Sequence, residues 1–389
     1  MIRRLYGELI ASIKHLYWNK FKYETHNLRY NWDSNVYSTI KKDTWETVNL
    51  SEIYQVTQGI HFRAFYPAIH LYKFSNASIF TYSDMVIEND DVMWDKAYFP
   101  TFSKTFPRDK NLLSYSNDVV KIKKYKEITI RGKCFSLTGT YAYIWSHFVL
   151  QYVSKLFLAN KMGIIDENTI ILAPHYEDVH LQKIVEAYIN KLGAKIVYLE
   201  KNIKYVCDEL YYIPTTCSTP NVCKYLLPQD YVMPEITKQA IKESLVLPYL
   251  SFRDDKKNYK LYLVRRNGAR KLLNWKEVEA FFDSEGFIFV EPHKLSLEEK
   301  IELFSNASII VGPFSSAFTN IIWCKSNCKV LMLSNHPRTV ESSFCELGDI
   351  ANVSMMYLTG DDTEKNNPHS DFYIDIKKVR ECYEYICNK

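Results

Sequence analysis

The sequence lacks several features that would assign it at once to a common class. It has no apolar run of about 18 residues, so it predicts no membrane-spanning helix. Its N-terminus lacks the uninterrupted apolar core of a secretory signal, so we expect a cytoplasmic protein. Its 49 basic and 45 acidic residues nearly balance, giving a net charge of +4. A dedicated nucleic-acid binder usually has an excess of basic charge, so no nucleic-acid partner is expected.

Several catalytic and cofactor motifs are also missing. The chain has no Walker loop, no Gly-x-Gly-x-x-Gly and no Gly-x-Ser-x-Gly, which argues against a kinase, a dehydrogenase and an α/β-hydrolase. None of its nine cysteines forms a Cys-x-x-Cys pair, so they are expected to be reduced thiols rather than zinc ligands. Its acidic pairs, such as Asp254 with Asp255, are adjacent instead of alternating as Asp-x-Asp. Neither a metal nor a cofactor is therefore predicted.

What the sequence does have is the composition of a globular protein of more than one domain. Hydrophobic residues make up 47% of the 389 residues and charged residues 24%. At about 150 residues per domain, this length predicts two domains. Residues 1–70 are expected to form an N-terminal extension that begins with an amphipathic basic helix. Such a helix either covers a core or rests on anionic lipid; the first is commoner, and peripheral membrane contact stays open.

Residues 71–215 have the pattern of a first α/β domain. The aromatic-rich stretch 20–126 favours short strands, and the spacing of apolar residues predicts a helix over 141–158. A strand at 169–173, a helix over 181–192 and a strand at 195–199 then form a strand–helix–strand unit, whose simplest form is a parallel crossover.

The remaining sequence divides into a connection, a more regular second domain and a final helix. Five prolines surround a helical stretch at 235–246, so residues 216–257 are interpreted as a linker. Residues 258–375 alternate strands and helices, with predicted N-caps at Asn274 and Ser296, which is typical of a doubly wound parallel sheet. Residues 376–389 form the last helix, whose apolar residues share one stripe.

Two loops of the second domain carry groups suited to an anion. Ligands of parallel sheets bind beyond the carboxyl ends of the strands, where Arg265, Arg266 and Arg270 follow one predicted strand. Of these, Arg265 and Arg270 are the preferred diphosphate ligands. The second loop follows the strand predicted at 308–311. Its Gly312 permits close approach of another backbone segment. Its other candidate phosphate ligands are polar residues around a helix start: Ser315, Ser316, Thr319 and Asn320. Equally, Ser315 or Ser316 could simply cap that helix.

His147 is the candidate general base. It lies on the polar face of the helix predicted over 141–158, where a neutral imidazole could take a proton from an attacking hydroxyl. The alternative is a histidine that only makes a structural hydrogen bond at a domain surface. The local sequence does not separate these two interpretations.

These residues resemble glycosyltransferase family 61, which includes enzymes of bacterial capsular polysaccharide biosynthesis. The resemblance rests on the run from Leu263 to Glu277, the segment from Leu295 to Phe304 and the glycine loop from Val311 to Asn320. The family's Tyr-Phe-His-Trp-type helix start is similar to the segment 143–148, which places His147 on a family position. Two departures stand out: Phe314-Ser315 replaces the usual His-Gly, and Lys300 stands where the family often has Gln.

The resemblance implies an inverting, metal-independent glycosyltransferase of GT-B arrangement, with two facing Rossmann-like domains. The C-terminal domain would bind a nucleotide-sugar donor and the N-terminal domain a saccharide acceptor, which could be lipid-linked, in capsular or lipopolysaccharide biosynthesis. The final helix would cross back to the first domain. A catalytically silent sugar- or nucleotide-binding module in a polysaccharide assembly complex is the alternative.

Overall fold

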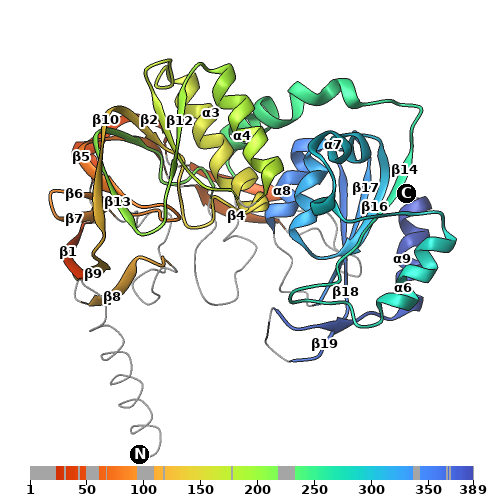
Figure 1. The fold of residues 1–389 in the computed structure, drawn as a ribbon. Coiled ribbons are helices and arrows are strands. Elements are labelled where there is room, and N and C mark those ends of the chain that lie inside the picture. Colours follow the sequence, from red (N-terminus) through yellow and green to blue (C-terminus); the bar gives the residue numbers. More distant parts are fainter. Residues whose placement is uncertain are drawn as a thin grey trace, which may run out of the picture.

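The computed structural model describes residues 23–29, 32–42, 44–49, 61–66, 68–93, 109–116, 119–176, 178–217, 233–335, 342–364, 367 and 369–388. Within these ranges the protein has a mixed α/β fold built on two main sheets, with helices α3, α4 and α8 between them (Figure 1). The predicted α/β class is therefore confirmed. The basic helix expected near the N-terminus lies outside the described residues.

The sheet of the second half is wholly parallel, as the alternating pattern predicted. Its strands run in the order β15-β14-β16-β17-β18. They are β14 (Tyr259–Leu263), β15 (Ile288–Val290), β16 (Ala307–Pro313), β17 (Lys329–Ser334) and β18 (Ser354–Thr359). Because β15 lies on one side of β14 and β16 on the other, the chain reverses its direction across the sheet between these strands. Such a switch point is where open parallel sheets leave a crevice for a ligand.

Two helices of this half, α6 and α7, begin where the sequence places their caps, and the half contains four further helices within the described residues. In chain order these helices are α6 (Trp275–Ser284), η7 (Pro292–Lys294), α7 (Leu297–Ser305), η8 (Ser316–Trp323), α8 (Ser342–Ala351) and α9 (Ile376–Asn388). Ser296 and Glu299 form the predicted capping box at the start of α7, with bonds of 3.1 and 2.7 Å. Asn274 is at the N-cap of α6, but its side chain bonds to Glu277 and to the carbonyl of Ile374 instead of the helix amides.

The first half is built on a mixed sheet, which departs from the parallel sheet expected there. Strands β12, β11, β10 and β13 are parallel neighbours, whereas β5 pairs antiparallel with β13 and leads into a mainly antiparallel extension. The strands are β1 (Tyr23–Arg29), β2 (Val36–Lys41), β5 (Ile69–Ile79), β6 (Val86–Glu88), β7 (Asp91–Met93), β8 (Leu112–Ser116), β9 (Val119–Lys123), β10 (Lys126–Ser136), β11 (Ile170–Pro174), β12 (Lys195–Leu199) and β13 (Ile203–Tyr212). Since β1 and β2 belong to this sheet, the first half begins before residue 71.

Five short elements lie outside the two main sheets and their helices. The η1 turn (Asp33–Asn35) precedes β2, and the hairpin of β3 (Thr44–Asn49) and β4 (His61–Tyr66) forms a separate two-stranded sheet. In the second half, β19 (Asp361–Asp362) pairs antiparallel with β20 (Phe372–Tyr373).

The helices of the first half match the apolar spacing of the sequence. The helix predicted over 141–158 runs from 145 to 161 as α2 (Trp145–His147), the π-helical η3 (Phe148–Tyr152) and α3 (Val153–Lys161). Helix α4 (Val179–Lys191) connects β11 to its parallel neighbour β12, which confirms the predicted strand–helix–strand unit. Asp178 caps α4 by accepting from two of its amides.

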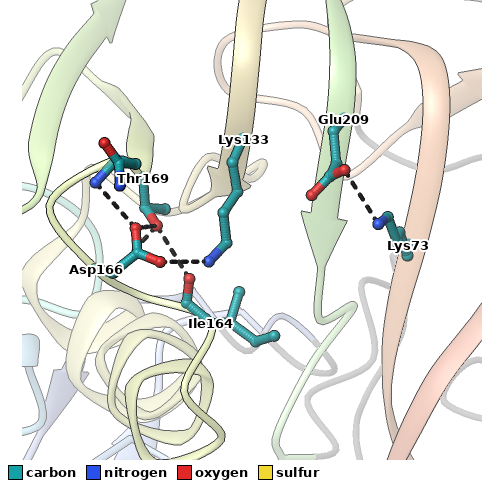
Figure 2. Close-up of polar contacts among 7 residues, drawn as sticks. Lys73, Lys133, Ile164, Asp166, Thr169 and Glu209 are labelled. Atoms are coloured by element: carbon teal, nitrogen blue, oxygen red, sulfur yellow. Dashed lines mark hydrogen bonds and ion pairs between the residues drawn. The ribbon is translucent and has the colours of Figure 1, made fainter.

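Side-chain bonds fix the turn that leads from α3 into β11 (Figure 2). Lys133 on β10 reaches Asp166 at 2.9 Å, and the same carboxylate accepts from Thr169, whose hydroxyl also donates to the carbonyl of Ile164. On the neighbouring strands, Lys73 and Glu209 form a half-exposed pair at 3.0 Å. The bonds around Asp166 order a backbone turn. An exposed ion pair such as Lys73 with Glu209 contributes little stability.

Helix α9 does not cross back to the first half, contrary to what the resemblance implies. Its apolar stripe, including Val379, Cys382 and Tyr383, is buried in a cluster with residues of the second half only. Among them are Phe281 and Phe282 of α6, which pack edge-on against Tyr383. Figure 1 shows α9 beside α6, on the side away from the first sheet. The amphipathic stripe was recognised correctly, but periodicity does not tell which surface an apolar face covers.

In the segment interpreted as a linker, the described helices pack into a core that both halves share. Its helices are α5 (Glu235–Ile241), η5 (Lys242–Val246) and η6 (Leu247–Phe252). Ile241 and Leu245 belong to one apolar cluster with side chains of both main sheets. Trp323 of η8 donates its indole N–H to the carbonyl of Leu245 at 2.7 Å and stacks on Trp145 of α2. These contacts hold the two halves together directly.

A buried ion pair adds to this junction. Lys238 of α5 pairs with Glu346 of α8, whose side chain is 1% exposed, and reaches Asp349 at 3.1 Å. Burial raises the pKa of Glu346 to about 6, although the ammonium of Lys238 opposes that change. The carboxylate is thus held in the core by its lysine partner.

We expect Lys238→Met to destabilise the protein by about 3 to 5 kcal/mol at pH 7.5, because it leaves the Glu346 carboxylate buried without its counter-charge. The loss of folding stability caused by Lys238→Met should be smaller at pH 5. The folded state binds the Glu346 proton more tightly than the unfolded chain does, so stability falls as the pH rises through the raised pKa. Urea denaturation at both pH values measures the effect.

The matched control is the double variant Lys238→Met with Glu346→Gln, which removes the uncompensated charge. It should recover part of the lost stability and lose the added pH dependence. Equal stability of Lys238→Met and the unmodified protein at pH 7.5 would contradict a structural role for the pair.

Candidate functional site

A cavity of about 360 Å³ lies at the switch point of the second sheet, beyond the carboxyl ends of β14 and β16. This volume is within the range of about 300 to 1,000 Å³ that is typical of small-molecule sites. Both loops predicted to bind an anion contribute to its wall. The lining residues are Trp145, Asp178, Val264, Arg265, Arg266, Asn267, Glu291, Pro292, His293, Lys300, Ser315, Ser316, Ala317 and Asn320. Trp145 and Asp178 come from the first half, so the cavity lies between the two halves.

The three arginines of the first loop have different environments. Arg266 forms a bidentate pair with Glu279 of α6, and its guanidinium lies 3.9 Å from the centre of the Trp275 ring. The Glu279 carboxylate is largely buried, so this arginine has a structural partner already. The sequence-based preference for Arg265 and Arg270 over Arg266 agrees with this difference.

Arg265 and Arg270 form a concentration of positive charge beside the cavity. Arg265 lines the wall and donates from Nε and Nη2 to the carbonyl of Ala269, at 3.1 and 2.6 Å. Burial, and secondly the charge of Arg270, lower the pKa of Arg265 to about 10. Arg270 has a φ of 61° and holds its guanidinium 4.6 Å from the centre of the Phe314 ring. Two cations held together in this way favour a bound anion.

Phe314 explains one departure from the family pattern. Its side chain is 2% exposed and packs edge-on against Phe344 of α8. The ring therefore supports Arg270 from the core side. At this position the aromatic residue positions a cation next to the cavity.

The glycine loop does not place all of its predicted residues in the cavity. A Cβ on Gly312 would lie 2.6 Å from the carbonyl oxygen of Leu263, so its missing side chain lets β16 approach β14. Thr319 is fully buried, and in the described part of the chain its hydroxyl has no hydrogen-bond partner. Neither residue lines the cavity, whereas Asn320 does. Gly312 shapes the site through strand packing instead of through contact with a ligand.

The two serines of this loop do line the cavity. Ser315 is at the N-cap of η8, but its side chain makes no capping bond. The alternative that Ser315 merely caps the helix is therefore not supported. The element is a 3₁₀-helix rather than the expected α-helix, and Ser316 at its start is exposed. Both hydroxyls and the first amides of η8 are suited to an anionic ligand.

His147 is not among the residues that line the cavity. Its ring stacks on Tyr141 with centroids 4.6 Å apart, and Nδ1 is 3.1 Å from Oε1 of Gln151. An amide oxygen only accepts, so this contact assigns the proton to Nδ1 and leaves the lone pair on Nε2. Burial lowers the pKa of His147, which favours the neutral ring at pH 7. Trp145, two residues earlier, is the part of this helical segment that lines the cavity.

Sequence reasoning missed several residues of the site. Trp145 lines the cavity, although it had no predicted role in the site. Asp178 and Lys300 also line the cavity, where the charge of the Asp178 carboxylate acts on the Lys300 ammonium. Asp84 was not a candidate either, but its charge acts on His147 and on the buried Lys155. No local signal joins these residues, because they come from distant segments.

Two features are absent from the described ranges. No group of three or more His, Cys, Asp or Glu side chains there is arranged to hold a metal ion. No helix in those ranges is both long enough and apolar enough to cross a bilayer. The predicted metal independence stays a prediction.

Comparison with known proteins agrees with the sequence resemblance. Residues 145–331 match the model of the family described as Glycosyltransferase 61. No curated protein matches the chain. The matched segment begins at Trp145 and ends in β17, so it includes His147 and both loops of the cavity. Over this segment the chain is similar to glycosyltransferase family 61.

Proposed function

We propose that the protein is an inverting glycosyltransferase that moves a sugar from a nucleotide-sugar donor to a saccharide acceptor in surface polysaccharide biosynthesis. The match of residues 145–331 to the family model supports glycosyl transfer. The observation that supports the finer proposal is the cavity at the switch point, where Arg265, Ser315 and Ser316 of the second half face Trp145 and Asp178 of the first. In a GT-B arrangement the donor would bind the second half and the acceptor would approach from the first.

The donor diphosphate is assigned to the end of β14 and the start of η8. Charge grows on this group as the sugar–phosphate bond breaks, so preorganised cations and amides stabilise the transition state more than the ground state. Arg265 and Arg270 supply the cations, and Ser315 and Ser316 supply hydroxyl groups and the amides of the helix start. No protein carboxylate pairs with Arg265 among the described residues, so an anion can bind it without breaking an ion pair.

His147 is assigned as the general base. Its Nε2 would take the proton of an acceptor hydroxyl while the hydroxyl oxygen attacks the anomeric carbon on the face opposite the diphosphate. Gln151 holds the ring in the required tautomer. His147 belongs to the helical segment of the first half that also contributes Trp145 to the cavity, and this supports a base on the side where the acceptor is expected.

We expect Arg265→Ala and Arg270→Ala each to weaken nucleoside diphosphate binding about 10- to 100-fold, the value of a charge-assisted hydrogen bond or two. Isothermal titration calorimetry measures the effect. Arg131→Ala is the matched control, because Arg131 is exposed on β10. Unchanged affinity in both loop variants would reject this assignment.

Arg266→Ala should lower thermal stability instead, because it leaves the buried Glu279 unpaired.

We expect His147→Gln to lower the turnover number about 10²- to 10⁴-fold while donor affinity stays nearly unchanged, because the base acts in the chemical step and not in donor binding. In the unmodified protein, turnover should fall only below pH 6.5. The lowered pKa keeps the ring neutral at pH 7, and its protonation at lower pH removes the lone pair.

His175→Ala is the control for this variant, since His175 is half-exposed and pairs with Glu200 away from the cavity. It should keep normal turnover. Retention of near-normal transfer by His147→Gln would show that another group is the base.

The overall proposal is tested with a panel of nucleotide sugars, first by thermal shift and then by nucleotide release with saccharide acceptors. A bound donor stabilises the native state and raises the melting temperature. Release of nucleotide that depends on an acceptor supports the transferase. Binding of a donor without turnover against a broad acceptor panel would instead favour a catalytically silent module.

A further inference from the structure

Lys300 is a buried cation in the wall of the same cavity. It is the fourth residue of α7, and its side chain is 6% exposed. Among the residues that the structure describes, its ammonium has no hydrogen bond and no ion pair, although its backbone amide bonds to Ser296. The side chain lines the cavity, so its free charge faces the space where a ligand would bind.

The position of Lys300 is unfavourable for a positive charge. Burial lowers its pKa, since the ammonium loses hydration that the protein does not replace. It also lies in the first turn of α7, close to the positive end of the helix dipole, where anionic side chains are preferred. Glu298 and Glu299 occupy that turn, but Glu299 is engaged in the capping box. Among the described residues, the charge of Asp178 opposes this effect, but Asp178 forms no ion pair with Lys300.

Three other charged groups of the cavity wall, apart from Arg265, are engaged within the protein. Glu291 accepts from Lys294 at 2.7 Å, and Arg266 pairs with Glu279. Asp178, across the cavity on the first half, uses one carboxylate oxygen to cap α4, with bonds of 2.8 and 3.3 Å. Its charge acts on Lys300, but no ion pair joins them within the described residues. The ligand is therefore expected to supply the anion that Lys300 lacks.

We propose that Lys300 binds an anionic oxygen of the donor and thereby determines which donors this protein accepts. The inference rests on the proposed function and goes beyond it, because it assigns a specificity role to a residue outside the diphosphate loops. Two groups of the donor could present this anionic oxygen to Lys300. It belongs either to a phosphate of the donor or to a carboxylate on its sugar, as in a hexuronate.

The experiment compares the unmodified protein with Lys300→Gln and Lys300→Met, which keep the side-chain length but remove the charge. Calorimetry measures the binding of a nucleoside diphosphate, the corresponding nucleotide-linked neutral hexose and the nucleotide-linked hexuronate. A phosphate contact predicts a loss of about 10- to 100-fold for all three ligands. A carboxylate contact predicts that loss for the hexuronate alone, together with a preference of the unmodified protein for it.

Lys256→Gln is the control, because it removes one positive charge from the same half of the protein at an exposed position that does not line the cavity. It should leave all three affinities nearly unchanged. In transfer assays, Lys300→Gln should raise KM for the affected donor more than it lowers kcat, since the lysine contributes to binding in the ground state. A merely structural lysine would change the melting temperature of the ligand-free protein without this separation.

The outcomes distinguish this inference from the function on which it rests. If the unmodified protein binds a donor and the Lys300 variants bind it equally well, the role of Lys300 is rejected and the proposed function stands. If the unmodified protein binds no nucleotide or nucleotide sugar, the proposed function fails and the role of Lys300 fails with it.

Discussion

Strands β14 and β16 approach so closely that a Cβ on Gly312 would lie 2.6 Å from the Leu263 carbonyl oxygen and 2.9 Å from the Leu263 Cβ. This contact lies at the ends of the two strands, where the chain changes direction across the parallel sheet. It sets the distance between the loop that carries Arg265 and the loop that carries Ser315. A bulkier residue would have to separate the strands, because the nearest atom is backbone and cannot move aside alone. The geometry of the cavity therefore depends on a residue that does not line it.

Positive charge is concentrated around this cavity. Burial, and secondly the charge of Arg270, lower the pKa of Arg265, and the guanidinium of Arg270 contacts the ring of Phe314. Lys300 adds a buried charge from another helix. Under the proposed function, a bound anion would offset these charges, so the same placement that costs stability would favour the ligand.

The junction of the two halves supplies the other wall. Trp145 stacks on Trp323, which in turn donates to the carbonyl of Leu245, and these contacts link the helical segment of His147 to the second sheet. The shared apolar core makes this a packed interface rather than a flexible connection. Prolines around residues 216–257 suggested a linker because they mark chain breaks, but burial of Ile241 and Leu245 depends on partners that the local sequence does not specify.

The sequence by itself determined the parallel α/β character of the second half, the capping box at Ser296 and the two loops that meet at the cavity, because caps, strand periodicity and arginine clusters are local signals. It also placed His147 on the polar face of a helix, and the family resemblance followed from the same residues. Only the tertiary structure decided that α9 packs on α6, that Gly312 contacts a strand and that Asp178 and Lys300 lie in one cavity. Those contacts join residues far apart in the chain. An apolar stripe or a single charged residue in the sequence does not identify the residue that it will contact.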